Sequence, residues 1–293
     1  MKKYIVSIAA GCAVAAMVTQ AWSAEKFSES PSGKADANFA LARGYLRGEG
    51  VPKDVEKAFT LMKQAADEGH AEAMGGVGYF YATGTVVPKD DAKAFEWFRK
   101  GAENGGAKAR LNLGKMLISG TGTAVNVDEG KRWMEMAASQ GLTEAMLELA
   151  HRCYSGTEGF TPDKPKALAW YLKAAEVGDL EAMNAAGVMF KEGDGVDLDP
   201  SQAENWLRRA ARLGHAKAQS NLGQLLGPVG HDEARRIEAL AWLVLAADQD
   251  EITATKMLAD VMPGMSAKDI AHAKKLADTM RREIMLNSLR KKS

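Results

Sequence analysis

Few side chains in this chain of 293 residues are placed for catalysis or metal binding. His70 and His215 each directly follow a glycine, and this shared setting indicates a structural position rather than a catalytic one. No His-Glu-x-x-His sequence is present, and the run His151-Arg152-Cys153 offers too few ligands for a zinc site. The histidines are His70, His151, His215, His231 and His272.

Nucleophile and phosphate motifs give no stronger signal. Ser-x-x-Lys occurs at Ser23–Lys26 and at Ser288–Lys291, without the Ser-Asp-Asn or Lys-Thr-Gly sequences that accompany it in penicillin-recognising enzymes. The glycines recur at a fixed interval instead of forming a phosphate-binding loop. We therefore predict a protein that is not an enzyme and has no cofactor or metal site.

The elements that carry these residues repeat along the chain. Five of the six tryptophans are separated by 36, 37, 36 and 36 residues, and two rows of small residues keep the same frame. A fixed period of this length indicates stacked repeats, each burying one face against the next. The tryptophans of this series are Trp97, Trp133, Trp170, Trp206 and Trp242, whereas Trp22 lies outside it. The rows are Ala37, Ala73, Ala109, Ala145, Ala182 and Ala218, and Ala42, Gly78, Gly114, Ala150, Gly187 and Gly223.

Each repeat is expected to contain two short helices. Small residues at helical spacing let two backbones approach closely, and the tryptophan fills the wider gap between repeats. A closing glycine ends one helix in the left-handed conformation, and Asp or Asn caps the start of another. The closing glycines are Gly69, Gly105, Gly141, Gly178 and Gly214, and the capping residues are Asp54, Asp90, Asn126, Asp163 and Asp199.

At these positions the chain resembles the Sel1-like repeats, which are related to the tetratricopeptide repeats. Their unit reads roughly A-x-x-x-L-G-x-x-Y-x-x-G-x-G-V, then D-x-x-K-A, then W-x-x-x-A-A-x-x-G. The first repeat fits it at Ala37, Tyr45, Gly48, Gly50, Val51, Asp54, Lys57, Ala58, Ala65, Ala66 and Gly69. Departures are Ala150 and Cys153 in the fourth repeat and Pro228 and Arg235 in the sixth. The resemblance implies an all-α, right-handed α-solenoid of about six helix-turn-helix repeats over residues 35–250.

The N-terminal segment differs in character from the repeats. Lys2 and Lys3 precede an apolar stretch, Tyr4–Val18, which predicts a signal peptide over residues 1–24 with cleavage after Ala21 or Ala24. Lipidation at Cys12 is an alternative. Residues 25–34 are predicted to be a disordered linker. The mature protein is then periplasmic or secreted and has no stable membrane span.

The C-terminal segment, residues 251–293, is predicted to contain a degenerate repeat, a capping helix and a basic tail. Ser266 is placed to cap a helix over residues 267–289. Ile270, Ala273, Ala277, Met280 and Ile284 fall on one face of that helix, which we expect to cover the last repeat.

Charge and cysteine content limit the expected partners and the possible disulfide bonds of the protein. Acidic and basic residues are equal at 38 each, and loss of Lys2 and Lys3 leaves a small acidic excess, so nucleic acid is not an expected partner. After cleavage Cys153 is the remaining cysteine, which excludes an intramolecular disulfide. Its position in the repeat predicts a buried thiol.

The remaining candidate is the surface of the first helices. By the resemblance, residues 72, 75, 79 and 82 lie on a face that lines a concave groove. One row there holds Arg43, Tyr79, Lys115, His151, Val188 and Gln224, and another holds Leu46, Ala82, Ile118, Tyr154, Lys191 and Gly227. Their mixed chemistry suits an extended peptide, although freedom from packing explains the variation equally well.

We therefore predict an exported scaffold or regulator that binds a protein or peptide. The predicted contact residues are Arg43, Tyr79, Lys115, His151, Tyr154 and Gln224. The alternative is an envelope enzyme, or a protein that binds peptidoglycan or β-lactams.

Overall fold

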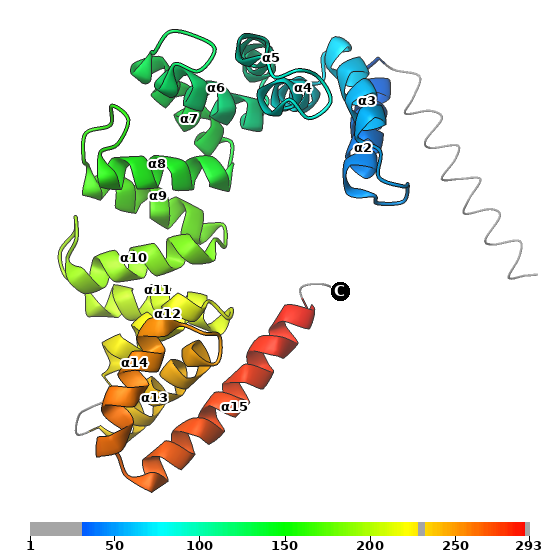
Figure 1. Cartoon of the computed structure of the whole chain (residues 1–293). Coiled ribbons are helices and arrows are strands. Elements are labelled where there is room, and N and C mark those ends of the chain that lie inside the picture. Colours follow the sequence, from blue (N-terminus) through cyan, green and yellow to red (C-terminus); the bar gives the residue numbers. More distant parts are fainter. Residues whose placement is uncertain (1–30, 228–231, 291–293) are drawn as a thin grey trace, which may run out of the picture. The chain divides into compact units, whose positions relative to one another are not determined.

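The computed structural model describes residues 31–227 and 232–290, and within these ranges the chain forms helices joined by turns, with no strand (Figure 1). The predicted all-α fold is thus confirmed. The structure divides into two compact units after Leu142, each of which is described by itself. The predictions on residues 1–30, including the signal peptide and Cys12, lie outside the described residues, as do Pro228, His231 and the last three residues of the tail.

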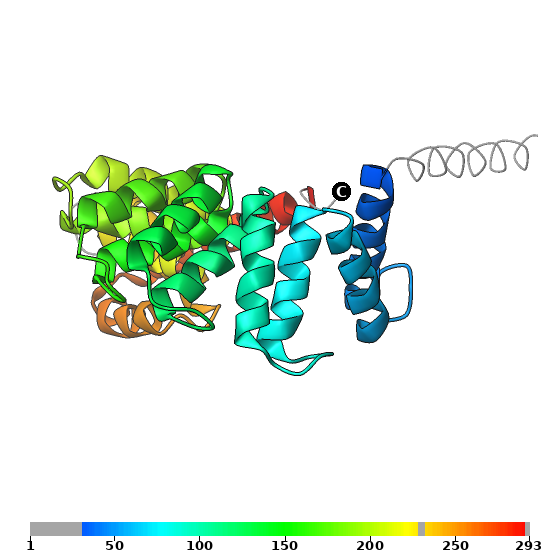
Figure 2. The ribbon, with the colours of Figure 1, turned by 90° about the horizontal axis from the view of Figure 1, so that it is seen from above.

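Six helices form the first unit. They follow one another in antiparallel order, and Figure 2 shows them side by side from above. They are α2 (Pro31–Arg47), α3 (Val55–Asp67), α4 (Ala71–Thr83), α5 (Asp91–Glu103), α6 (Ala107–Ser119) and α7 (Val127–Ser139).

The second unit continues the same alternation and ends in a longer helix. Its elements are α8 (Thr143–Ser155), α9 (Lys164–Glu176), α10 (Leu180–Glu192), α11 (Pro200–Arg212), α12 (Ala216–Leu226), α13 (Glu233–Ala247), α14 (Ile252–Val261), a 3₁₀ turn (Met262–Gly264) and α15 (Ala267–Arg290).

The start of α2 corrects one sequence-based boundary. We predicted a disordered linker through residue 34, but the helix begins at Pro31. Proline is favoured in the first turn of a helix because its missing N–H group would have no helical partner there. Ala35 is buried, and the Lys34 ammonium lies 3.0 Å from the Glu68 carboxylate, so contacts with α3 hold the added turn.

The ends of the helices form as the sequence predicted. Asp54, Asp90, Asn126, Asp163 and Asp199 each accept a hydrogen bond from a backbone N–H in the first turn of the second helix of a repeat. The closing glycines have φ values of +88° to +100°, a region that other residues rarely adopt. These caps fix where each helix starts and stops, and therefore which residues face the neighbouring helix.

The small-residue row sets how closely the two helices of a repeat approach. A Cβ atom added at Gly78 would lie 2.9 Å from the ring of Phe98, and one added at Gly114 would lie 2.6 Å from Cγ of Met134. Both distances are shorter than real contacts, so these positions require glycine. The residue after each tryptophan thus packs within its own repeat.

The alanine row and the tryptophans join successive repeats. In the first unit, Ala109 is fully buried and lies against Gly75 and Gly101 of the preceding repeat. Trp97 packs on the buried cluster that includes Met62 and Val77 of α3 and α4. Ala37 is exposed because the described chain offers no earlier repeat for it to contact.

Helix α15 forms as predicted and packs on the sixth repeat. The Ser266 hydroxyl accepts the N–H of Asp269 at 3.0 Å, and Ala273 and Ala277 are fully buried. We expected this helix to cover the last repeat, and it packs along α13, the second helix of the sixth repeat.

Ion pairs at both ends fix the direction of α15. Arg236, near the start of α13, lies 2.8 Å from Asp269, and Arg281 pairs with Asp248 just after the end of α13. The two helices therefore run parallel, and the last turns of α15 extend beyond α13. Met285, a residue of this extension, is 60% exposed.

Candidate binding surface

Three of the predicted contact residues belong to the first unit. Tyr79 in α4 is 59% exposed, Arg43 in α2 is exposed with its guanidinium 5.9 Å from the ring centre of Phe39, and Lys115 in α6 is half-buried. Because α4 and α6 contact one another and Tyr79 and Lys115 hold equivalent positions, both lie on the same side of this helix pair. This side presents an aromatic ring and cationic groups together.

The other three belong to the second unit. His151 in α8 is exposed, and its ring meets Tyr171 edge-on at 5.7 Å between centroids. Tyr154, one turn further along α8, is 41% exposed, and Gln224 in α12 is exposed. Burial raises the pKa of Tyr171 to about 12, so the phenol beside His151 stays neutral at physiological pH.

Tyr154 is engaged in a network between two repeats. Its hydroxyl donates to Asp194 Oδ2 at 2.7 Å, and the Lys164 ammonium lies 2.5 Å from Asp194 Oδ1. The hydrogen bond from Lys164 is the largest influence that lowers the pKa of Asp194, and the bond to Asp194 raises the pKa of Tyr154. The phenol is therefore held in one orientation with its ring partly exposed.

Gln224 is also tied to the neighbouring repeat. Its side-chain oxygen accepts a hydrogen bond from Lys191 Nζ at 2.6 Å. One turn earlier, Asn221 donates its amide to Asn184 at 2.9 Å, again between α12 and α10. Polar groups on the first helices of this unit thus form cross-repeat hydrogen bonds that orient the surface.

Some residues expected on this face are part of the core instead. Gly75 is buried because the Cβ of Ala109 packs directly against it. Ile118 is 4% exposed, and its side chain occupies the space that a Cβ on Gly130 would need. Ala82 is half-buried against the cluster around Phe98. The row that contains Tyr79 is therefore more open than the row that contains Tyr154.

The paired histidines have the structural role that their position predicted. Nδ1 of His70 accepts the N–H of Ala73 at 3.1 Å, and Nδ1 of His215 accepts the N–H of Ala218 at 3.2 Å. Nε2 of His215 faces Glu181 of the preceding repeat at 3.2 Å. Each imidazole caps a first helix and contacts a carboxylate of the repeat before it.

The remaining features to compare with the structure are the cysteine, the metal ligands and the membrane-spanning segments. Cys153 is 3% exposed, which confirms the prediction of a buried thiol. Across residues 31–227 and 232–290, no group of three or more His, Cys, Asp or Glu residues is arranged to hold a metal ion. None of the helices in these ranges is long and apolar enough to cross a membrane.

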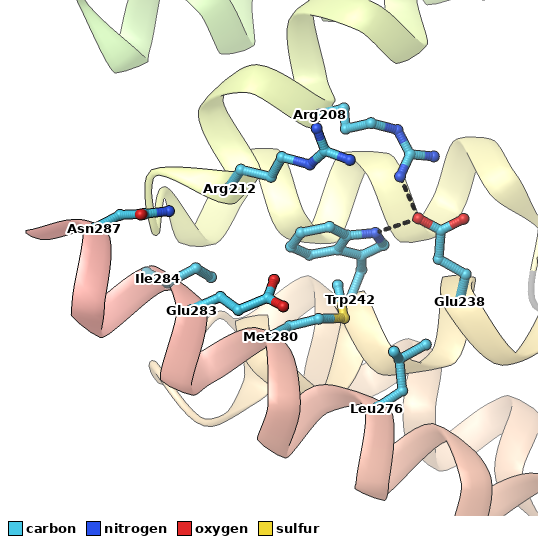
Figure 3. A pocket seen from close by; sticks show the side chains of 9 residues that line it. All are labelled: Arg208, Arg212, Glu238, Trp242, Leu276, Met280, Glu283, Ile284 and Asn287. Carbon is cyan, nitrogen blue, oxygen red and sulfur yellow. Dashed lines mark hydrogen bonds and ion pairs between the residues drawn. The ribbon is translucent and has the colours of Figure 1, made fainter.

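A pocket that the sequence did not indicate lies between α15 and the helices α11 and α13 (Figure 3). Glu238 of α13 accepts hydrogen bonds from Arg208 and from the indole N–H of Trp242. Burial by itself would raise the pKa of Glu238, but the hydrogen bonds from Arg208 and Trp242 and the charges of Arg208 and Arg212 outweigh it and lower the pKa. Only the path of α15 creates this pocket, so repeat spacing carries no signal for it.

These features define a protein of stacked two-helix repeats with exposed polar and aromatic groups on the first helices. The Sel1 repeat family model matches six consecutive segments of the chain, residues 35–70, 71–106, 107–142, 143–179, 180–215 and 216–251. The chain therefore belongs to the Sel1 repeat family.

Similar proteins agree with this assignment. The crystal structure of a Sel1 repeat protein from Oxalobacter formigenes is similar with a TM-score of 0.62 and 29% identity, covering 76% of this chain and 92% of that one. Uncharacterized protein NMB1327 of Neisseria meningitidis serogroup B is 34% identical over 119 residues, 41% of this chain and 24% of the relative. Chitin synthase regulatory factor 3 of Schizosaccharomyces pombe is 45% identical over 67 residues, 22% of this chain and 7% of the relative. The matched parts thus span less than a quarter of either curated relative.

Proposed function

We propose that this Sel1 repeat protein is an exported scaffold or regulator that binds a protein or peptide through the open row on its first helices. The open row comprises Arg43, Tyr79 and Lys115 in the first unit and His151, Val188 and Gln224 in the second, where Tyr154 lies one turn away from His151. The observation that carries the proposal is the exposure of Tyr79, an aromatic side chain that packing does not require at that position.

The chemistry of the row suits an extended polypeptide. Tyrosine gives a large contact area with little loss of side-chain entropy on binding. The neighbouring Lys115 and Arg43 add cationic groups for carboxylates or backbone carbonyls of a partner. In the second unit, Tyr154 and Gln224 are already oriented by hydrogen bonds to Asp194 and Lys191, which lowers the entropic cost of binding.

The relatives support a role in interaction rather than chemistry. One relative of this chain is named as a regulatory factor of chitin synthase, although the match covers 7% of its length. A stacked helical repeat provides an extended surface whose packing residues stay constant while its surface residues change. Those two properties suit recognition of another polypeptide.

Site-specific photo-crosslinking tests the proposed surface. A photoreactive amino acid placed at position 79 or 151 should trap a partner in native envelope extracts. The matched control is position 136, because Met136 is a 40% exposed residue of the second helix α7. Equal trapping at all three positions, or trapping at position 136 alone, would place the partner on another surface.

Export requires a separate experiment. Intact-mass measurement of the protein from its native host should give a chain that begins after Ala21 or Ala24, as the apolar stretch Tyr4–Val18 predicts. A product that retains Met1 or begins at Lys2 and stays in the cytoplasm would refute this part of the proposal.

A further inference from the structure

The pocket beside α15 is distinct from the open row of the first helices. It has a volume of about 380 Å³ and is bounded by α11 and α13 on one side and by α15 on the other. Trp242 lies at its base with 2% exposure, and Leu276, Met280 and Ile284 of α15 supply an apolar wall (Figure 3). A pocket of this size accommodates a branched or aromatic group.

Two of the charges at the base neutralise each other. Arg208 donates to Glu238 and also to Glu204, the latter at 2.7 Å, so its guanidinium is already satisfied. Glu238 accepts from Arg208 and from Trp242 at 3.2 Å. A ligand therefore gains little from displacing these groups, and they act as a fixed polar support for the indole ring.

Arg212 differs from Arg208 although it lies one helical turn away. It lines the pocket, is exposed, and makes no hydrogen bond or ion pair with another residue of the described chain, although its charge contributes to the lowered pKa of Glu238. Figure 3 shows its side chain extending over Trp242 toward Arg208, whereas Asn287 of α15 lies at the other end of the pocket. A guanidinium beside an apolar wall offers two parallel hydrogen-bond donors to a planar anion.

We propose that this pocket binds a monocarboxylate that carries an apolar group of about the size of a leucine side chain. Arg212 holds the carboxylate, and the apolar group lies against Met280 and Ile284. Such a ligand is either a small free acid or the C-terminal carboxylate of a peptide that ends in an apolar residue.

Glu283 restricts the charge of the ligand. It lines the pocket from α15 and forms no hydrogen bond or ion pair with any other described residue, so its negative charge faces the same space. Repulsion from Glu283 disfavours a second anionic group, and phosphates and dicarboxylates are therefore poor candidates. A ligand with a single carboxylate close to Arg212 experiences less of this repulsion than a ligand with two negative charges.

Titration of the full chain tests the proposal with N-acetyl-leucine as the probe. Binding is measured by calorimetry and by the NMR shift of the Met280 methyl group, which Met280→Leu assigns. N-acetyl-leucine amide has the same apolar group without the charge, and it should bind at least about tenfold more weakly. A hexapeptide that ends in leucine, compared with N-acetyl-leucine, distinguishes a peptide terminus from a small acid as the natural source.

Substitutions separate the site from the fold. Arg212→Ala should weaken binding of N-acetyl-leucine about tenfold or more. The matched control Arg209→Ala removes the same charge from α11, but Arg209 stacks on Trp206 and does not line the pocket, so binding should be unchanged. Glu283→Gln should leave binding equal or tighter. Circular dichroism should give the same melting temperature for the wild type and for Arg212→Ala.

The outcomes are distinguishable. Loss of affinity in Arg212→Ala, with Arg209→Ala unchanged and the acid preferred over its amide, supports the proposal. Equal binding of acid and amide, unchanged affinity in Arg212→Ala, weaker binding in Glu283→Gln, or no binding of either probe would each overturn it. These results do not depend on the open row of the first helices.

Discussion

The tryptophan at the centre of the repeat series gives a quantitative test of how the repeats are held together. Trp170 in α9 is 9% exposed, and the Lys173 ammonium lies 4.0 Å from its ring centre. Replacement by alanine removes the indole and leaves a cavity that the surrounding helices close only in part. We expect Trp170→Ala to destabilise the protein strongly without changing its helical fold.

The magnitude follows from the area that the side chain buries. A buried aromatic side chain removes about 200 Å² from water, which at about 25 cal/mol per Å² amounts to about 5 kcal/mol. The unfolded chain already covers part of this area, and alanine retains some of it. The expected loss is therefore about 3–5 kcal/mol, of which the contact with Lys173 accounts for no more than about 1 kcal/mol.

Urea unfolding followed by circular dichroism at 222 nm measures this loss. Lys173→Ala is the control for the cation–π contact and should cost no more than about 1 kcal/mol. Trp97→Ala is the control for burial, because Trp97 is half-buried and should cost less than Trp170→Ala. Equal effects for Trp97→Ala and Trp170→Ala, or a loss below about 1 kcal/mol for the latter, would refute the packing argument.

Further predictions concern close packing, capping and pH. Gly114→Ala should destabilise by about 1–3 kcal/mol in urea unfolding because no space exists for its Cβ, whereas Gly264→Ala, with nothing within 4 Å of that Cβ, should be nearly neutral. His215→Ala should cost about 1 kcal/mol through loss of its cap. Lys164 lowers the pKa of Asp194, so that carboxylate stabilises the fold above its unfolded pKa of about 4 and loses this effect as the pH falls. Asp194→Asn should therefore lower the melting temperature at pH 7 but not at pH 2.

The repeat architecture could be predicted because capping, turn-forming and close-packing residues recur at the same positions in each repeat. The capping role of Asp54, the left-handed conformation of Gly69 and the close approach at Gly78 each depend on residues a few positions away or on the next repeat. A period of 36 or 37 residues places these capping, turn and packing residues at equivalent positions in successive repeats. The buried thiol of Cys153 followed from the same frame.

The candidate surface was only partly predictable. The repeat frame correctly predicted that Tyr79 is exposed. It also placed Gly75 and Ile118 on the exposed face, but neighbouring side chains cover both residues. The link between Tyr154 and Asp194 joins two residues 40 positions apart through a loop that does not follow the repeat closely. Such contacts depend on side-chain orientation rather than on spacing.

The course of α15 could not be predicted from the repeat pattern. The sequence indicated the helix, its cap at Ser266 and its apolar face, but both α13 and α14 were available as partners. The choice of α13 depends on paired charges such as Arg236 with Asp269, which are contacts between distant segments. The pocket that contains Arg212 exists only as a consequence of that choice.

The affinity of the partner captured by photo-crosslinking for Tyr79→Ala tests the central claim most directly. Because Tyr79 is 59% exposed, its loss should leave the melting temperature nearly unchanged but should weaken binding by about 1–2 kcal/mol, the range of a moderate hot spot. The control Met136→Ala, on the second helix α7, should bind like the wild type. Normal binding by Tyr79→Ala together with loss of binding by Met136→Ala would contradict the account and would place the partner on the second helices.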